Sequence, residues 1–325
     1  MKAAIFQGPR QFTAGELDLP APGERDVLVR NLYAGICGSA AAAAVHEAEA
    51  GGGFGREVIA EVVAKGDAVE GVAVGDRIHP VTSSRSAPAS PALSEFTLLP
   101  AAKSGEQFYP VSRQIPVKAA TLIEPFLVGA HAAGRGEPEN DDTAVVFGAG
   151  RVGIATAIAL KRFGCSQVMV VDRSDLRLQL AAKLGFATCH TGLEDLASKA
   201  IEVFGTARSA SGITADVDIF VDAAGDDAVI RTYQAMGRVF SRMVVVGIRP
   251  RPLPVDLTEL WSAHQEIVGS DGAGPQDVDF VLKGMQSPEF DVESLVTHEF
   301  PLGELATALE VASDPHVALA VAIKF

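Results

Sequence analysis

A glycine-rich turn between an apolar strand and a helix is the strongest constraint in this sequence. Residues 145–147 are apolar, and Gly148-Ala149-Gly150-Arg151-Val152-Gly153 follows them directly. In such a GxGxxG motif the first glycine permits a tight turn and the second lets a pyrophosphate approach the backbone. The third lets helix and strand pack closely. A helix over 151–163 would present its N-terminus to the phosphates. The motif predicts a dinucleotide site of the Rossmann type, with Gly148, Gly150, Arg151, Val152 and Gly153 as its cofactor-binding residues.

An acidic residue stands where such a site needs one. A second apolar strand, over 168–171, ends at Asp172, nineteen positions after Gly153. A carboxylate there accepts hydrogen bonds from the adenine ribose hydroxyls and repels a 2′-phosphate, which favours NAD over NADP. Arg173 follows directly, and an arginine at that place can hold a 2′-phosphate, so NAD is favoured rather than required.

Later strand ends predict further cofactor contacts. Apolar strands over 218–221 and 243–246 flank a helical pattern over 228–237, and alternation of this kind is typical of a parallel sheet with helices on both faces. Ligands bind at the carboxyl ends of strands in doubly wound sheets. The cofactor residues predicted from these ends and from the strand-like 266–270 are Ala224, Gly225, Gly247, Ile248 and Ser270. Each later glycine, taken singly, fits an ordinary loop equally well.

The first hundred residues have a different pattern from the alternating strands and helices that follow residue 121. Short strand-like runs, such as 27–33 and 58–63, alternate with turns rich in glycine, proline and charge. This spacing favours a barrel-like, mostly antiparallel domain. A Ser/Pro/Ala-rich loop is predicted over 81–91, and the C-terminal tail adds a helix over 303–312 and a strand over 319–323. The predicted fold class is therefore a mostly-β domain joined to a doubly wound α/β domain.

Composition excludes several functions. The net charge of −14 argues against a nucleic-acid partner, because phosphates attract basic surfaces. No run of about 18 apolar residues is long enough to span a membrane, and the N-terminus has no apolar signal core, so we expect a cytoplasmic protein. The three cysteines form no CxxC pair, which argues against a disulfide framework or a closed zinc knuckle.

Motifs beyond the glycine turn extend along nearly the whole chain. They are Ala34-Gly35-Ile36-Cys37-Gly38-Ser39, Gly55-Arg56-Glu57, Val74-Gly75-Asp76-Arg77-Ile78, Leu122-Ile123-Glu124-Pro125 and Thr297-His298-Glu299-Phe300-Pro301-Leu302. In this order and spacing they resemble the medium-chain dehydrogenase/reductase superfamily, most closely its sorbitol- and threonine-dehydrogenase-like zinc branch. The resemblance implies a GroES-like catalytic domain over 1–121 and 272–325, interrupted by a Rossmann dinucleotide-binding domain over 122–271.

The catalytic zinc of that family is where this chain departs from the resemblance. A cysteine, a histidine and an acid hold the metal there, and this chain keeps Cys37 and Glu124. Arg56 occupies the histidine position, and arginine does not lose its proton in a protein and so does not ligate a metal. Cys37, Glu57 and Glu124 alone would make a poor zinc site. The segment 80–88 has no cysteine for the family's structural zinc. We therefore expect no zinc.

Another group must then stabilise charge on the substrate oxygen during hydride transfer. Our hypothesis places that positive charge on Arg56, held by Glu57 or Glu124 in the same predicted site as Cys37. Ser39 would pass the proton, because family members use a hydroxyl at its position. The alternative is that Arg56 is a structural ion-pair partner that neutralises two acids in a vestigial metal pocket.

These features predict an NAD(P)-dependent oxidoreductase that interconverts a small polar alcohol and a carbonyl without zinc. Three other readings stay open: a zinc-free reductase of activated carbon–carbon double bonds, an orthodox zinc dehydrogenase, and a cofactor-binding protein that has lost catalysis. His46 and His131 are weaker candidates for a general acid, since a lone histidine is more often a surface or packing residue. The resemblance also implies a homodimer, because the sheet edge near 266–270 pairs with its copy in the family.

Overall fold

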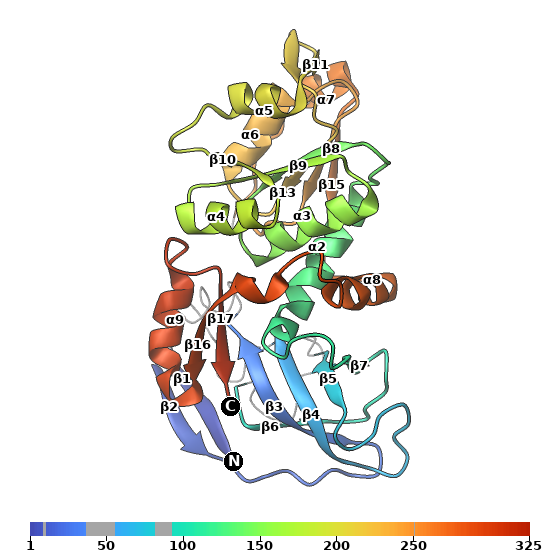
Figure 1. The fold of residues 1–325 in the computed structure, drawn as a ribbon, viewed down its shortest axis with the longest axis vertical. Helices are drawn as coiled ribbons and strands as arrows, with labels where there is room; N and C mark the ends of the chain where they lie inside the picture. The colour runs from blue at the N-terminus through green and yellow to red at the C-terminus, as the bar shows by residue number, and fades with distance from the viewer. Residues whose placement is uncertain (9–10, 37–55, 82–92, 250) are drawn as a thin grey trace. The chain divides into compact units, whose positions relative to one another are not determined.

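The chain folds into two compact units, each with its own sheet. The computed structural model describes residues 1–8, 11–36, 56–81, 93–249 and 251–325. One unit comprises Met1–Glu124 with Leu282–Phe325, and the other is Pro125–Val281. Helices α2 (Ile123–Arg135) and α8 (Pro275–Met285) lie at the two changes of unit (Figure 1). The predicted boundaries, after residues 121 and 271, precede both helices.

The first unit is built on a mostly antiparallel sheet. Its strands follow the order β16-β17-β3-β4-β5-β7, with β6 also paired to β3, and a separate hairpin joins β1 and β2. The bounds are β1 Lys2–Gly8, β2 Gln11–Glu16, β3 Val27–Gly35, β4 Val58–Lys65, β5 Arg77–Pro80, β6 Phe96–Leu99, β7 Phe108–Pro110, β16 Val296–Pro301 and β17 Ala320–Lys324. The short helices of this unit are η1 Ala119–Leu122, η2 Val292–Leu295, η3 Leu302–Glu304 and α9 Leu305–Ser313.

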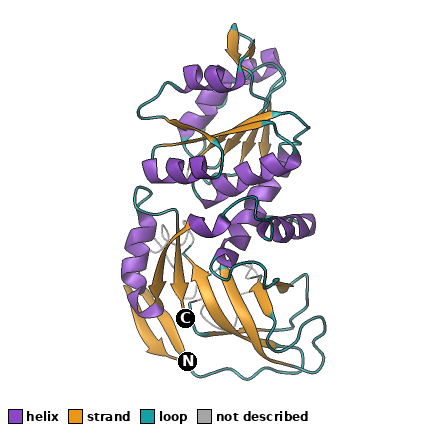
Figure 2. Ribbon diagram, in the orientation of Figure 1, coloured by secondary structure: helices purple, strands orange, loops and turns teal. Residues whose placement is uncertain are grey.

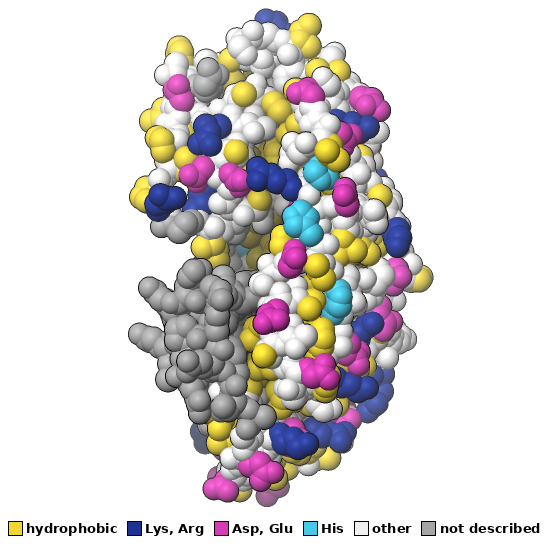
Figure 3. Space-filling view, turned by 90° about the vertical axis from the view of Figure 1, so that its left-hand side faces the viewer, with side chains coloured by type: hydrophobic (Ala, Val, Ile, Leu, Met, Phe, Trp, Pro, Cys, Tyr) yellow, Lys and Arg dark blue, Asp and Glu magenta, His cyan; other side chains and the backbone are white. Residues whose placement is uncertain are grey.

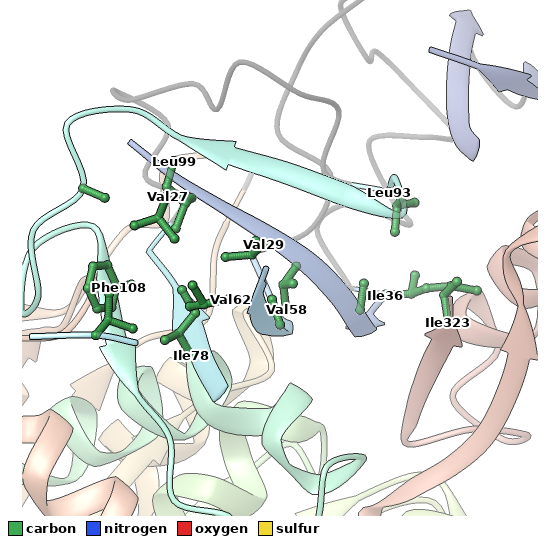
Figure 4. Close-up of a cluster of buried hydrophobic side chains, with 14 of the residues drawn as sticks. Val27, Val29, Ile36, Val58, Val62, Ile78, Leu93, Leu99, Phe108 and Ile323 are labelled. Carbon is green, nitrogen blue, oxygen red and sulfur yellow. The ribbon is translucent and has the colours of Figure 1, made fainter. Parts of the chain in front are cut away.

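The core of this unit comes from alternate side chains of neighbouring strands. Val27 and Val29 of β3 lie with Val58 and Val62 of β4 in one buried cluster (Figure 4). Side chains two apart on a strand point to the same face, so one face of β3 and β4 supplies the cluster. β17, from the other end of the chain, adds Ile323. The C-terminal segment therefore contributes strands to the sheet of the N-terminal segment.

The second unit is a parallel sheet in the order β10-β9-β8-β13-β14-β15. Figure 2 shows helices on both faces of it. The strand bounds are β8 Thr143–Phe147, β9 Gln167–Asp172, β10 Ala187–His190, β13 Ile219–Asp222, β14 Arg242–Val245 and β15 Glu266–Gly269, and a small hairpin adds β11 Thr206–Arg208 and β12 Ile213–Ala215. The helices are α3 Arg151–Phe163, α4 Asp175–Lys183, α5 Leu196–Phe204, α6 Asp227–Met236 and α7 Leu257–Ala263. The predicted doubly wound architecture is confirmed.

Helix α3 occupies the range predicted for it because both of its ends are encoded locally. Gly150 precedes it in an extended conformation, and Gly164 ends it in the left-handed region at φ +111°, where glycine has no Cβ penalty. Lys161 and Arg162 stand in the last turn, where positive charge complements the helix dipole. Residues Gly153 to Leu160 are all buried, so this helix packs closely on the sheet.

Charge is distributed over the surface without a field of one sign on the face shown in Figure 3, where acidic and basic side chains are interspersed. Within the described ranges, no helix is long and apolar enough to cross a bilayer.

His79 on β5 makes the stability of the first unit sensitive to acid. Its side chain is buried, its Nδ1 donates to the carbonyl oxygen of Val58 at 2.9 Å, and burial lowers its pKa from 6.5 to about 4. Because the unfolded chain binds the proton more tightly, His79 favours folding fully above pH 6.5, and this contribution is lost as pH falls towards 4.

We expect wild-type protein to lose about 3 kcal/mol of unfolding free energy through this group between those two pH values. In His79→Gln that part of the pH dependence should vanish, as measured by urea unfolding at several pH values. The exposed His316→Gln should behave like wild type. Identical pH profiles for His79→Gln and wild type would contradict this assignment.

Candidate functional site

The turn between β8 and α3 is held in a conformation that glycine alone fits. Gly148 has φ +98°, and its N–H donates to the Val171 carbonyl on β9 at 2.8 Å. A Cβ built on Gly153 would lie 1.8 Å from the Gly148 carbonyl oxygen. Gly150 caps α3 without a side chain. The turn therefore presents bare backbone and a helix N-terminus, with Arg151 and Val152 in the first helical turn, and these fit a pyrophosphate.

Asp172 is fixed at the end of β9 by three backbone amides. Its Oδ1 accepts from the N–H groups of Arg173 at 2.7 Å and Ser174 at 2.9 Å, and its Oδ2 accepts from Ala149 N–H at 2.6 Å. The carboxylate thus ties the glycine turn to the neighbouring strand. Each carboxylate oxygen has two lone pairs, so Oδ2 keeps acceptor capacity for a ribose hydroxyl.

Arg173 pairs with an acid from another strand end. Its Nη2 lies 3.8 Å from Oδ2 of Asp226, the N-cap residue of α6. With side chains 72% and 48% exposed, such a pair contributes at most about 1 kcal/mol. The acid nevertheless offsets part of the arginine's charge beside Asp172.

The loops that follow β13 and β14 interlock. A Cβ on Gly247 would lie 2.3 Å from Gly225 N, and one on Gly225 would lie 2.4 Å from the Ile248 carbonyl oxygen. The side chain of Ile248 is 83% exposed. The structure thus brings the predicted residues Ala224, Gly225, Gly247 and Ile248 together at the carboxyl ends of neighbouring strands.

Two residues beneath these loops were not predicted as site residues. Asp222, the last residue of β13, has a fully buried carboxylate, and Arg249 pairs with its Oδ2. The apolar run before Asp222 is a weak sequence signal that the end of this strand is buried. Nothing local links that run to an arginine 27 positions later. Sequence reasoning therefore had no means to pair them.

Ser270 follows β15 at the same edge of the sheet. Its N–H donates to the Val245 carbonyl oxygen at 3.0 Å, which extends the ladder by one residue. Its hydroxyl oxygen is buried and has no hydrogen-bond partner among the described residues. A buried unpaired hydroxyl carries a desolvation cost that a ligand can relieve, and this fits the role predicted for Ser270.

Two of the charged residues predicted for the site of the first unit, Arg56 and Glu124, lie close together. Arg56 Nε is 3.7 Å from Glu124 Oε1, and the two side chains are 47% and 21% exposed. Glu57 is buried against Gly35, where a Cβ would lie 2.3 Å from the Glu57 carboxylate. The predicted site residues Cys37 and Ser39, like His46, lie outside the described residues.

His131 has a structural partner. On α2, its Nδ1 lies 3.0 Å from Oδ2 of the buried Asp277, which also accepts from Gly274 N–H at 2.7 Å. The carboxylate thereby joins α2 to the start of α8. This contact gives His131 the packing role that a lone histidine most often has.

Arg56 does not fit as a zinc ligand. The position that the resemblance assigns to a histidine ligand carries the guanidinium of Arg56, already paired with Glu124. In residues 56–81, 93–249 and the other described ranges, no group of three or more His, Cys, Asp or Glu side chains is arranged to hold a metal ion.

Two family models match the chain. Residues 152–287 match the zinc-binding dehydrogenase family, and residues 23–95 match the alcohol dehydrogenase GroES-like domain. The starvation-sensing protein RspB of Escherichia coli K12 is 26% identical over 343 residues, covering 96% of this chain and 95% of that protein. Sorbitol dehydrogenase of Bacillus subtilis is 27% identical over 344 residues, covering 96% and 93% respectively.

Solved structures share the whole fold. A short-chain alcohol dehydrogenase (rspB) from E. coli CFT073, complexed with cofactor NADH, superposes with a TM-score of 0.84 at 22% identity, covering 100% of this chain and 99% of that one. This likeness shows that the fold is shared, and the two domain matches are of the kind that the sequence predicts for a dehydrogenase with a GroES-like domain.

The glycine turn can be tested with one added methyl group. In Gly153→Ala the new Cβ would meet the Gly148 carbonyl oxygen, and relief of that overlap must shift the turn. A cost of about 1–3 kcal/mol corresponds to NADH binding weakened about 10- to 100-fold. Isothermal titration calorimetry measures it.

The matched control is Gly134→Ala on α2, where a Cβ meets nothing within 4 Å, and its NADH affinity should equal that of wild type. Equal affinity in Gly153→Ala would contradict the role of the turn.

Proposed function

We propose that this protein is an NAD(H)-dependent dehydrogenase that interconverts an alcohol and a carbonyl on a small polar substrate. The glycine turn, with the amide-bound Asp172 beside it, is the observation that carries the proposal. Bound at this edge, nicotinamide would supply or accept the hydride. The alcohol and polyol activities named for relatives, such as sorbitol dehydrogenase, support the substrate class.

The cofactor preference proposed is NAD over NADP. Asp172 is rigidly held and negatively charged, which favours ribose hydroxyls over a 2′-phosphate. Arg173 is the residue that could oppose this preference, and its pairing with Asp226 weakens its pull on a phosphate. The residues that would hold NAD are those predicted from the sequence: the glycine motif, Asp172, the loops after β13 and β14, and Ser270.

The chemistry proposed does not require zinc. In oxidation the alcohol loses a hydride from carbon and a proton from oxygen, and negative charge gathers on that oxygen as the proton leaves. Arg56 would stabilise this charge, and Glu124 would hold the guanidinium in place. Ser39 would relay the proton, taking it up from the alcohol as its own hydroxyl proton passes to solvent water. Arg56 is nearly half exposed, so its charge is accessible to a ligand.

The same ion pair is compatible with a second candidate function. Pairing with Glu124 at 3.7 Å is also what a merely structural arginine would do in a protein that binds the cofactor without turning it over. Turnover with NADH across a panel of carbonyls, compared with NADPH, separates the two candidates, and binding without turnover would favour the second.

Replacement of the guanidinium tests its catalytic role. In Arg56→Ala we expect kcat to fall on the order of 100-fold, because a charge placed at a developing oxyanion stabilises the transition state. NADH affinity should stay unchanged. The control is Arg30→Ala, which removes an exposed arginine paired with Glu61 at 3.3 Å in the same unit. Unchanged turnover in Arg56→Ala would remove Arg56 from the mechanism.

A homodimer is proposed from the free edge of the second sheet. β15 is the last strand in the order, and its residues 266 and 270 donate to β14, so the amides of Ile267 and Gly269 face outward. Leu257 and Trp261 on neighbouring α7 are 71% and 78% exposed. An exposed edge beside apolar side chains favours pairing with a second copy.

Light scattering should give a dimer for wild type and a monomer for Ile267→Pro, which removes one outward N–H. Leu193→Ser, after β10 at the opposite sheet edge, should stay dimeric. A monomeric wild type would contradict the proposal.

A further inference from the structure

Asp222 is the most deeply buried acid beside the proposed cofactor edge. Its Oδ1 accepts from the N–H groups of Ala224 at 3.0 Å and Gly225 at 2.9 Å. Its backbone oxygen accepts from the N–H groups of Val246 at 3.0 Å and Gly247 at 2.8 Å. Asp222, at the end of β13, therefore holds the backbone of two loops by hydrogen bonds: the loop after β13 and the loop after β14.

Arg249 closes this arrangement from the loop after β14. Its Nη2 donates to Asp222 Oδ2 and to the Asp226 carbonyl oxygen at 3.2 Å, and its Nε lies 3.8 Å from Asp227 Oδ1. The Arg249 side chain is only 12% exposed. One guanidinium thus joins the end of β13, the start of α6 and its own loop, and this forked geometry is one that lysine does not reproduce.

Removal of Arg249 would leave a charged oxygen without a donor. Oδ1 of Asp222 keeps its two amides, but Arg249 is the side chain that the described structure pairs with Oδ2. A buried carboxylate oxygen without a partner must regain water or a proton. Either change moves the loop backbone, and Gly225 and Gly247 are packed too closely to accommodate the movement without shifting both loops.

The strand order decides which part of a dinucleotide would be affected. β8, which carries the glycine turn, lies between β9 and β13. Asp172 at the end of β9 would hold the adenine ribose, and the turn would hold the pyrophosphate. The nicotinamide half must then extend towards the ends of β13 and β14, where Gly225, Gly247 and the exposed Ile248 lie.

We infer that Arg249 is a positioning residue for the nicotinamide half of the cofactor. It acts through Asp222 and the two loops that Asp222 holds. The inference rests on the proposed NAD(H) site. Arg249 would not touch the adenine half of the cofactor, and its effect would be confined to the nicotinamide half.

Comparison of NADH with ADP, which carries the adenine, ribose and pyrophosphate alone, tests this confinement by isothermal titration calorimetry. In Arg249→Met we expect NADH binding to weaken at least about tenfold while ADP binding stays within about twofold of wild type. Arg249→Lys keeps the charge but not the fork, and it should show the same split more mildly. If Arg249→Met does not fold, Arg249→Lys is the variant that tests the inference. Arg251→Met, at an exposed arginine two positions on, is the control with unchanged affinity for both ligands.

Equal losses for NADH and ADP would show a general structural role and overturn the inference, and so would unchanged NADH binding in both Arg249 variants. Failure of the proposed NAD(H) site has a different signature, because wild type itself would then bind neither NADH nor ADP. Loss of catalysis alone would leave wild-type binding intact and show only as absent turnover.

Discussion

The close contact between Gly153 and Gly148 is the constraint on which the second unit depends. It brings the first turn of α3 against the end of β8, so the helix N-terminus and the bare turn face the same edge of the sheet. Asp172 then fastens that turn to β9 through the Ala149 amide. A side chain at Gly153 would overlap the Gly148 carbonyl oxygen and separate these parts. One local packing requirement thus positions the helix, the turn and the acid together. A short motif is therefore enough to predict this part of the structure.

Arg56 and Arg249 each pair with an acid, but at different depths in the protein. Arg56 and Glu124 are partly exposed, and an isolated exposed pair contributes only about 0–1 kcal/mol, so its value would lie in the charge it presents. Asp222 is fully buried and Arg249 is only 12% exposed, and removal of one partner of a buried pair typically costs about 3–5 kcal/mol. In the proposed function the first pair would serve the chemistry and the second the architecture, and the expected consequences of their removal differ accordingly.

Local signals in the sequence predict the fold well. Helix α3 has its predicted bounds because glycines encode both of its ends, and the strands 168–171 and 243–246 lie within one residue of β9 and β14 because they are continuous apolar runs. Pairings between distant residues were a different matter. The Asp222–Arg249 pair depends on how the loops after two strands meet, and β11 and β12 are three-residue strands without a clear pattern. The charged pair Arg56–Glu124 was anticipated only through a family resemblance that brings the two motifs together.

The central claim is that the chain retains the nicotinamide chemistry of its superfamily while an arginine replaces the metal's positive charge. The most direct measurement is zinc content by mass spectrometry on purified protein, with NADH-dependent turnover assayed before and after a chelator. The account predicts less than about a tenth of a zinc per chain and full activity after chelation. Near-stoichiometric zinc, lost together with activity, would contradict it and would make Cys37, Glu57 and Glu124 the ligands.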